Sequence, residues 1–222
     1  ELDSFDEMQR EIFGPVLHVV RYARADLGKL LQQINDSGYG LTLGVHTRID
    51  ETIAQVVNSA KVGNLYVNRN MVGAVVGVQP FGGEGLSGTG PKAGGPLYMY
   101  RLLAIRPQDA VAKQLQQESG EITRPAEQAK VIQALQEWAA KHEPSLSALS
   151  AQYVELAQSG TVQMLTGPTG ERNSYSLLPR EHVLCLADDR SDLLVQLAAA
   201  LAVGCHVLWQ EGELTRELFA AL

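Results

Sequence analysis

The residues most suited to chemistry lie between Gly73 and Gly95, in the sequence GAVVGVQPFGGEGLSGTGPKAGG. This segment holds nine of the chain's 21 glycines, a density that no regular helix or strand would carry. Glycine lets main-chain N–H groups approach a ligand because no Cβ stands in the way, and inside a regular element it costs roughly 0.5–1 kcal/mol relative to alanine. We therefore predict a binding site in which the backbone itself contacts the ligand.

A flexible glycine-serine linker is the alternative interpretation of this segment, but such linkers are hydrophilic. The segment and its continuation instead carry large apolar side chains, namely Val75, Val76, Val78, Phe81, Leu86, Leu97 and Tyr98. We therefore favour the binding site.

The composition indicates an acidic globular protein. The chain has 222 residues, 45% of them hydrophobic, which is enough for one large domain or two small ones. The formal net charge is −7 and no Lys/Arg run is interleaved with aromatic residues, so we expect no nucleic-acid binding by this chain. The longest apolar run, residues 193–209, is interrupted by Gln196 and Gly204 and falls short of the ~18 residues of a membrane span.

The two cysteines, Cys185 and Cys205, lie in apolar surroundings without metal-ligand spacing. We expect buried thiols rather than a disulfide, which points to a reducing cytosol. The chain begins at Glu1 without Met and without the charged and apolar regions of a signal peptide. We interpret it as a segment of a longer protein.

Strands and helices are expected to alternate in the first half. The apolar pattern predicts strands at 16–20, 41–47 and 64–68, a helix from about residue 27 with Asp26 as its N-cap, and a second helix that starts at Asp50. This alternation is typical of βαβ units and predicts the α/β class.

Polar residues between 106 and 125 predict a linker or extended flap that separates a domain at 1–105 from one at 126–222. Two helices separated by Pro144 should follow, and then a βαβ unit between residues 183 and 209. The loop GPTGERN at 167–173 leaves a phosphate-binding loop open as an alternative, although it lacks the Lys/Ser pair of a P-loop.

Five motifs in the first half resemble, in order and spacing, the last third of the catalytic domain of the aldehyde dehydrogenase superfamily. They are Glu11–Pro15 (EIFGP), Asn35–Leu41 (NDSGYGL), His46–Arg48 (HTR), Val62–Asn68 (VGNLYVN) and Pro80–Gly88 (PFGGEGLSG). The stretch 68–96 resembles most the glutamate semialdehyde (pyrroline-5-carboxylate) dehydrogenase domain of the bifunctional bacterial flavoenzymes of proline catabolism. The resemblance covers residues 1 to about 105.

The resemblance implies roles for five residues. Glu11 is expected to hold the nicotinamide-ribose hydroxyls of NAD, since a carboxylate can accept two hydrogen bonds, and Phe13 to pack near the nicotinamide. The N–H groups of Gly73 and Ala74 are expected to anchor the α-carboxylate of the substrate, beside an aromatic wall formed by Phe81. The simpler alternative for the first pair is that Glu11 caps a turn and Phe13 belongs to the core.

The resemblance places the nucleophilic cysteine, the general-base glutamate, the oxyanion-hole asparagine and the dinucleotide-binding domain of the family upstream of residue 1. We therefore expect no catalytic residue, no metal site and no bound cofactor in this chain alone, and no dehydrogenase activity from it. Cys185 and Cys205 do not replace the nucleophile, because neither follows a glycine-rich loop. Asn68 and Ser87 are expected to satisfy turn backbone.

Residues 183–213 resemble, more faintly, the cofactor-binding strand-helix-strand of the same superfamily. Gln210 stands where the family has a lysine, Glu213 matches a glutamate, and the carboxylates of Asp188 and Asp189 stand where an active-site turn is expected. Lost positive charge and added negative charge oppose a dinucleotide phosphate. We therefore predict a degenerate Rossmann-like domain that does not bind NAD, and the resemblance implies that it covers the aldehyde dehydrogenase site and seals a tunnel.

Two classes of function remain open. The first is part of a bifunctional enzyme that oxidises proline to glutamate, with FAD in its proline dehydrogenase and NAD in its dehydrogenase for glutamate semialdehyde. The second is a non-catalytic lid or assembly segment, and an aldehyde dehydrogenase of another substrate class is the alternative among enzymes. The resemblance implies a cytoplasmic protein and leaves open a homo-oligomer, peripheral association with the inner membrane and a DNA-binding segment elsewhere.

Overall fold

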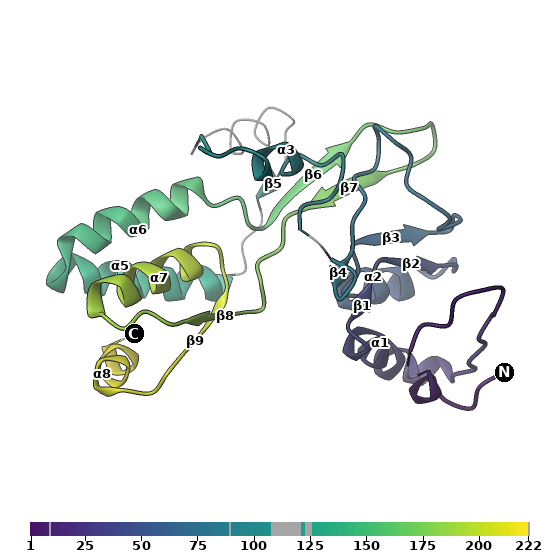
Figure 1. Cartoon of the computed structure of the whole chain (residues 1–222), viewed down its shortest axis with the longest axis horizontal. Coiled ribbons are helices and arrows are strands. Elements are labelled where there is room, and N and C mark those ends of the chain that lie inside the picture. Colours follow the sequence, from purple (N-terminus) through teal and green to yellow (C-terminus); the bar gives the residue numbers. More distant parts are fainter. Residues whose placement is uncertain (9, 89, 108–120, 123–125, 222) are drawn as a thin grey trace. The chain divides into compact units, whose positions relative to one another are not determined.

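The computed structural model describes residues 1–8, 10–88, 90–107, 121–122 and 126–221 (Figure 1). The chain separates into two compact units, an N-terminal unit of residues 1–102 and a C-terminal unit of residues 103–222. Most of the linker or flap predicted at 106–125 lies outside the described residues, so that boundary stays a prediction. No helix in the described ranges is long and apolar enough to cross a membrane.

A βαβ unit forms the centre of the N-terminal unit. Strands β2 (Thr42–Val45) and β3 (Asn64–Val67) are parallel, with Leu43 opposite Leu65, and helix α2 (Asp50–Ser59) connects them. The remaining elements are short, apart from α1: η1 (Phe5–Glu7), η2 (Arg24–Asp26), α1 (Leu27–Asp36), β1 (Tyr39–Gly40), β4 (Glu84–Gly85) and α3 (Tyr98–Arg101). The predicted alternation of strand and helix is confirmed here.

The two faces of the β2–β3 sheet are covered by different parts of the unit. One face packs on the two helices through the buried residues Leu27, Leu31 and Val56. Each fully buried aliphatic side chain contributes roughly 1.5–3 kcal/mol. Side chains alternate along a strand, so Asn64 lies on the other face, and its hydrogen bond to the carbonyl of Pro80 attaches the glycine-rich segment there.

One local expectation for the N-terminal unit is wrong, and a second, the N-cap at Asp26, is right in position but not in its hydrogen bond. Residues 16–20 form no strand, because a strand needs a partner and Val20 makes only an isolated bridge with Leu2. Asp26 precedes α1 but its side chain makes no capping hydrogen bond. Its own backbone lies in a turn conformation with φ −93° and ψ 6°, whereas a side-chain N-cap typically needs an extended residue.

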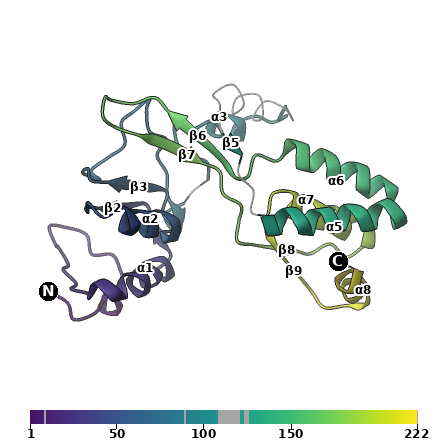
Figure 2. The same ribbon diagram turned by 180° about the vertical axis from the view of Figure 1, so that it is seen from behind.

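The C-terminal unit combines a helical layer with two small sheets. Its helices are α5 (Ala126–His142), α6 (Pro144–Leu156), α7 (Arg190–Ala202) and α8 (Glu213–Ala221). Figures 1 and 2 show α5, α6 and α7 side by side, and their shared core includes Leu135, Leu146 and Leu197. Strands β8 (His182–Cys185) and β9 (His206–Trp209) are parallel and joined by α7, so the predicted βαβ unit is confirmed.

The loop at 167–173 is the tip of a β-hairpin. It connects β6 (Thr161–Leu165) to β7 (Asn173–Ser176), which pair antiparallel in one sheet with β5 (Glu121–Ile122). A P-loop needs a helix after the loop, whose N-terminal N–H groups bind the phosphate. The loop is therefore not a P-loop, because a strand follows it.

Arg190 connects the helices of the C-terminal unit at the start of α7. Its guanidinium lies 2.8 Å from the carboxylate of Glu143, ahead of α6, and 3.9 Å from that of Glu217 in α8. The guanidinium carbon also lies 5.7 Å from the ring centre of Trp138 in α5. The charged groups are partly exposed, so each contact contributes modestly, but together they fix how the helices meet.

Candidate functional site

Part of the glycine density serves the packing of the chain on itself. A Cβ at Gly83 would collide with the carbonyl oxygen of Ser87, and one at Gly85 with that of Gly38. Gly85 also has φ +56°, a backbone conformation that favours glycine. At Gly83 and Gly85, the absence of a Cβ therefore lets the backbone approach another part of the same chain, not a ligand.

Gly73 differs from these packed glycines. An added Cβ there would meet no atom within 4 Å, and the residue is exposed. Within the described residues, neither its N–H group nor that of Ala74 donates a hydrogen bond. The predicted carboxylate anchor therefore consists of two adjacent N–H groups that the fold leaves available.

The N–H groups on either side of this pair are both used. Val72 donates to the side-chain oxygen of Asn70 at 3.3 Å, and Val75 donates to that of Gln79 at 3.0 Å. The N–H groups of Val76 and Gly77, in the turn that follows, also have no acceptor among the described residues. The turn is closed by Val78 and Gln79, which both donate to the carbonyl of Val75.

Phe81 is fixed by main-chain hydrogen bonds. Its N–H donates to the carbonyl of Ala93 at 3.0 Å and its carbonyl accepts from Ala93 at 2.9 Å. The ring is half-buried. Phe81 thus lies in an ordered part of the same segment that carries Gly73 and Ala74, which suits a wall beside a ligand.

Asn64 and Lys92 hold the segment around Phe81, and the sequence analysis missed both. Asn64 bonds to Pro80 and Gly82, and the Nζ amine of Lys92 donates to the carbonyl of Gly63. Burial lowers the pKa of the Lys92 amine, and the carboxylate of Glu84 opposes part of that shift. The signal in the sequence was Lys92 as the single cation of the glycine-rich stretch 73–95, whose one other charged residue is Glu84.

Glu11 and Phe13 lie in a segment without regular structure. Phe13 is 87% exposed, so it does not belong to the described core, contrary to the simpler alternative. The carboxylate of Glu11 forms no hydrogen bond or ion pair with any described residue. In the described residues, no hydrogen bond joins Glu11 or Phe13 to Gly73 or Ala74. The predicted cofactor residues and the predicted substrate residues are therefore not connected by hydrogen bonds there.

Asn68 and Ser87 satisfy backbone groups, as expected. The amide of Asn68 accepts from the N–H of Thr47 at 3.0 Å and donates to its carbonyl at 2.9 Å, which ties the ends of β2 and β3 together. Asn68 does so with φ 55°. Ser87 accepts from the N–H of Gly40 at 3.2 Å.

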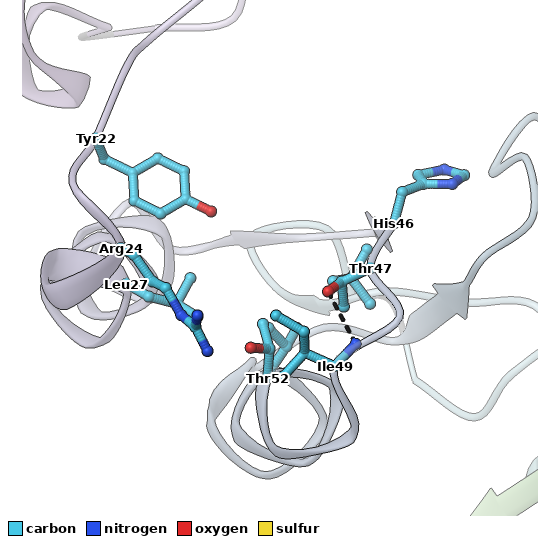
Figure 3. A pocket seen from close by; sticks show the side chains of 9 residues that line it. Tyr22, Arg24, Leu27, His46, Thr47, Ile49 and Thr52 are labelled. Carbon is cyan, nitrogen blue, oxygen red and sulfur yellow. Dashed lines mark hydrogen bonds between the residues drawn. The ribbon is translucent and has the colours of Figure 1, made fainter.

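A pocket of about 300 Å³ lies elsewhere in the N-terminal unit (Figure 3). In Figure 3, Tyr22 and Arg24 extend from the segment before α1, whereas the ring of His46 points away from them. Its lining is Tyr22, Arg24, Leu27, Val45, His46, Thr47, Ile49, Thr52 and Val56. The lining has no thiol or carboxylate and includes none of the predicted site residues.

Neither cysteine is placed as a nucleophile in the described residues. Both cysteines are free and buried, and burial raises the pKa of the Cys185 thiol, which disfavours the nucleophilic thiolate. No group of three or more His, Cys, Asp or Glu side chains there could hold a metal ion.

The start of α7 is capped by a carboxylate of the chain itself. The carboxylate of Asp189 accepts the N–H of Asp192 at 3.0 Å, and this hydrogen bond is the main cause that lowers the pKa of Asp189. The same carboxylate raises the pKa of Asp192. A helix N-terminus can bind a phosphate, but here the protein's own anion already occupies it.

Comparison with known proteins relates the first half to a family. Residues 3–106 match the model of the aldehyde dehydrogenase family. The predicted resemblance of this part of the chain to that family and the predicted α/β class are confirmed.

The whole chain is similar to larger proteins. It is 68% identical over 222 residues to the bifunctional protein PutA of Klebsiella aerogenes, a match that covers 98% of this chain and 17% of that protein. It is 48% identical over 103 residues to the 1-pyrroline-5-carboxylate dehydrogenase of Staphylococcus saprophyticus, covering 46% of this chain and 20% of that protein. The chain thus spans about one-sixth of the length of the PutA relative.

Among solved structures, the chain is similar to proline utilization A (PutA) from Corynebacterium freiburgense. The match has a TM-score of 0.68 and 26% identity, and covers 96% of this chain and 21% of that one. The similarity therefore extends into both compact units.

Proposed function

We propose that the chain is part of the NAD-dependent glutamate semialdehyde dehydrogenase of a bifunctional protein that converts proline to glutamate. The family of residues 3–106 and the similarity to PutA and 1-pyrroline-5-carboxylate dehydrogenases support this function. The observation that carries the substrate assignment is the pair of available N–H groups at Gly73 and Ala74.

The substrate carries an α-carboxylate at the end opposite its aldehyde. Hydrogen bonds from two N–H groups to a carboxylate are charge-assisted and therefore strong. Gly73 lets a carboxylate approach without a side chain in the way, and Phe81 supplies an aromatic surface for the aliphatic carbons. In this proposal, the anchor sets the distance between the carboxylate and the reacting carbon, and so selects the length of the aldehyde.

NAD, when bound, supplies the hydride acceptor. The described residues that fit it are Glu11 and Phe13, since a carboxylate without a protein partner can accept ribose hydroxyls and an exposed ring can contact a nicotinamide. No described residue is assigned to FAD, which belongs to the proline dehydrogenase part of the longer protein in this proposal. The thiolate and the general base likewise belong to the rest of that protein.

Gly73→Val in the full-length protein tests the anchor. Two charge-assisted hydrogen bonds contribute roughly 1.5–3 kcal/mol each, so we expect KM for glutamate semialdehyde to rise on the order of a hundredfold or more. KM for NAD and turnover of an aliphatic aldehyde without a carboxylate should stay near the wild-type values. Gly28→Ala in α1 is the control, because its Cβ would meet its nearest neighbour, the Gln55 amide, at an ordinary 3.5 Å.

If Gly73→Val lowered kcat/KM equally for both aldehydes without changing the thermal stability, the carboxylate-anchor proposal would be overturned. That result would favour an aldehyde dehydrogenase of another substrate class, because the carboxylate would then make no difference to binding.

For the C-terminal unit we propose a non-catalytic role as a covering or assembly element. Asp189 at the start of α7, and Gln210 in place of a lysine, support the absence of NAD binding. Calorimetric titration of the chain with NAD should give no saturable heat, and Gln210→Lys alone should not restore it. Saturable micromolar binding that Gln210→Lys strengthens would contradict this role.

The setting of the longer protein is also a proposal. Two free buried cysteines suit a reducing compartment, so we infer a cytoplasmic location. Homo-oligomerisation and peripheral association with the inner membrane are tested by light scattering of the full-length protein and by its recovery in the soluble or membrane fraction of cells.

A further inference from the structure

Gln79 contacts Val75 at two points. Its side-chain oxygen accepts the N–H of Val75 at 3.0 Å, and its own N–H donates to the carbonyl of Val75 at 2.9 Å. Both bonds span four residues and enclose the turn that contains Gly77, whose φ is +80°. Gln79 therefore holds the N–H of Val75 through its side chain and the carbonyl of Val75 through its main chain.

Fixing the N–H of Val75 also fixes the peptide group before it. A peptide group is planar and trans, so its N–H and C=O point in opposite directions. The N–H of Val75 and the carbonyl of Ala74 belong to one such group, and the bond to Gln79 therefore sets where that carbonyl points. If this peptide group rotated, the negative end of the Ala74 carbonyl dipole could turn toward a bound carboxylate.

We propose that Gln79 is a positioning residue that makes the site selective for aldehydes carrying a carboxylate. It holds the Ala74–Val75 peptide group so that the N–H groups of Gly73 and Ala74, rather than the Ala74 carbonyl, face the ligand. Gln79 does not touch the substrate in this role. The inference rests on the proposed function of Gly73 and Ala74 as a carboxylate anchor.

Several features of the segment support this role. Gln79 is half-buried, while Gly73 is exposed with open space around it, so the Gln79 side chain can hold the turn and leave the donors accessible. On the other side of the pair, the N–H of Val72 is taken by Asn70 at a longer 3.3 Å. The amide of Gln79 is thus the closer of the two side-chain acceptors that border the available donors.

The test is Gln79→Met in the full-length protein, since methionine has a similar size and no acceptor oxygen of this kind. The probes are glutamate semialdehyde and pentanal, an unbranched aldehyde without a carboxylate. KM for glutamate semialdehyde should rise about tenfold, the effect of roughly one hydrogen bond, while kcat stays within about twofold. The kinetic constants for pentanal should stay within about twofold as well.

The quantity to compare is kcat/KM for glutamate semialdehyde divided by kcat/KM for pentanal. This ratio does not depend on how much of the variant is folded. A purely structural role would lower both values and leave the ratio unchanged, and that outcome would overturn the inference. Gln133→Ala is the matched control, since Gln133 also makes a side-chain hydrogen bond, to Glu137 at 3.0 Å, but within α5.

Gly73→Val measured in parallel separates this inference from the proposed function. If Gly73→Val lowers the ratio and Gln79→Met does not, the anchor stands and the role of Gln79 is wrong. If Gly73→Val also leaves the ratio unchanged, the carboxylate anchor fails and the inference fails with it.

Discussion

Asn64 holds Gly82 across 18 residues of sequence, through the oxygen of its side-chain amide at 3.2 Å from the Gly82 nitrogen. The nitrogen of the same amide donates to the carbonyl of Pro80 at 2.9 Å. Phe81 lies between these two residues, so one side chain on strand β3 sets the position of the predicted aromatic wall.

Asn64→Leu should loosen the segment around Phe81. The substitution leaves a part-buried N–H and carbonyl without partners, and such a loss costs about 1–3 kcal/mol. We expect faster hydrogen exchange at Phe81 and Ala93, whose amides bond to each other. Mass spectrometry of peptides from residues 63–95 measures this, with exposed Asn58→Ala in α2 as the control. Unchanged exchange in the Asn64 variant would show that the amide does not hold the segment.

Gly63→Ala should lower stability, whereas Gly73→Ala should not. A Cβ at Gly63 would overlap the carbonyl oxygen of Gly82, which is backbone and cannot move without shifting the segment. A Cβ at Gly73 meets nothing within 4 Å. We expect Gly63→Ala to lower the Tm and the soluble yield, and Gly73→Ala to leave both unchanged. A Tm loss in both variants would mean that Gly73 is also a packing glycine.

Asp189→Ala should destabilise the C-terminal unit in a pH-dependent way. The pKa of Asp189 lies below its ordinary value in the folded chain, mainly because its carboxylate accepts the N–H of Asp192. The ionised group therefore stabilises the fold above the unfolded pKa, near 3.8, and this contribution is lost as pH falls through the folded pKa. The Tm difference from wild type should be larger near pH 7 than near pH 3.

Fluorescence of Trp138 and Trp209 can follow this unfolding, since both lie in the C-terminal unit. Asp188→Ala is the matched control, because Asp188 is an exposed neighbour and the capping bond at the start of α7 comes from Asp189. A Tm difference for Asp189→Ala that does not change with pH would contradict a charged cap.

The chain alone should form no NADH from glutamate semialdehyde and NAD. Cys185 and Cys205 are 3% and 6% exposed, so neither thiol can reach a substrate in the folded chain. We also expect both thiols to resist a disulfide reagent in the native chain and to react together after denaturation with urea. Rapid labelling of the native chain, or cofactor-dependent turnover, would refute this assignment.

The sequence alone was sufficient for the family, the α/β class and both βαβ units. Those features depend on local patterns: the apolar stripe with Leu27 and Leu31 in α1, the strand at Asn64–Val67, and the glycine that ends α7 with φ +84° at Gly204. Periodicity and turn chemistry act over a few residues, so they can be recognised without knowing the partners.

Pairing and side-chain partners depended on tertiary structure. The run at 16–20 has strand composition but only an isolated bridge at Val20, because a strand forms only where another strand supplies hydrogen bonds. The loop at 167–173 has the glycines of a phosphate-binding loop, but the antiparallel partner β7 makes it a hairpin tip.

In the glycine-rich segment, too, the sequence predicts some features and the tertiary structure decides others. The sequence located the segment and singled out Gly73 and Ala74. It does not show which glycines of the segment pack against other atoms and which lie in open space. Only the fold distinguishes Gly85, which packs against Gly38, from Gly73, which has open space around it. The roles of Asn64, Gln79 and Lys92 were also decided by the fold, because a side-chain hydrogen bond depends on which backbone groups the folded chain brings within about 3 Å.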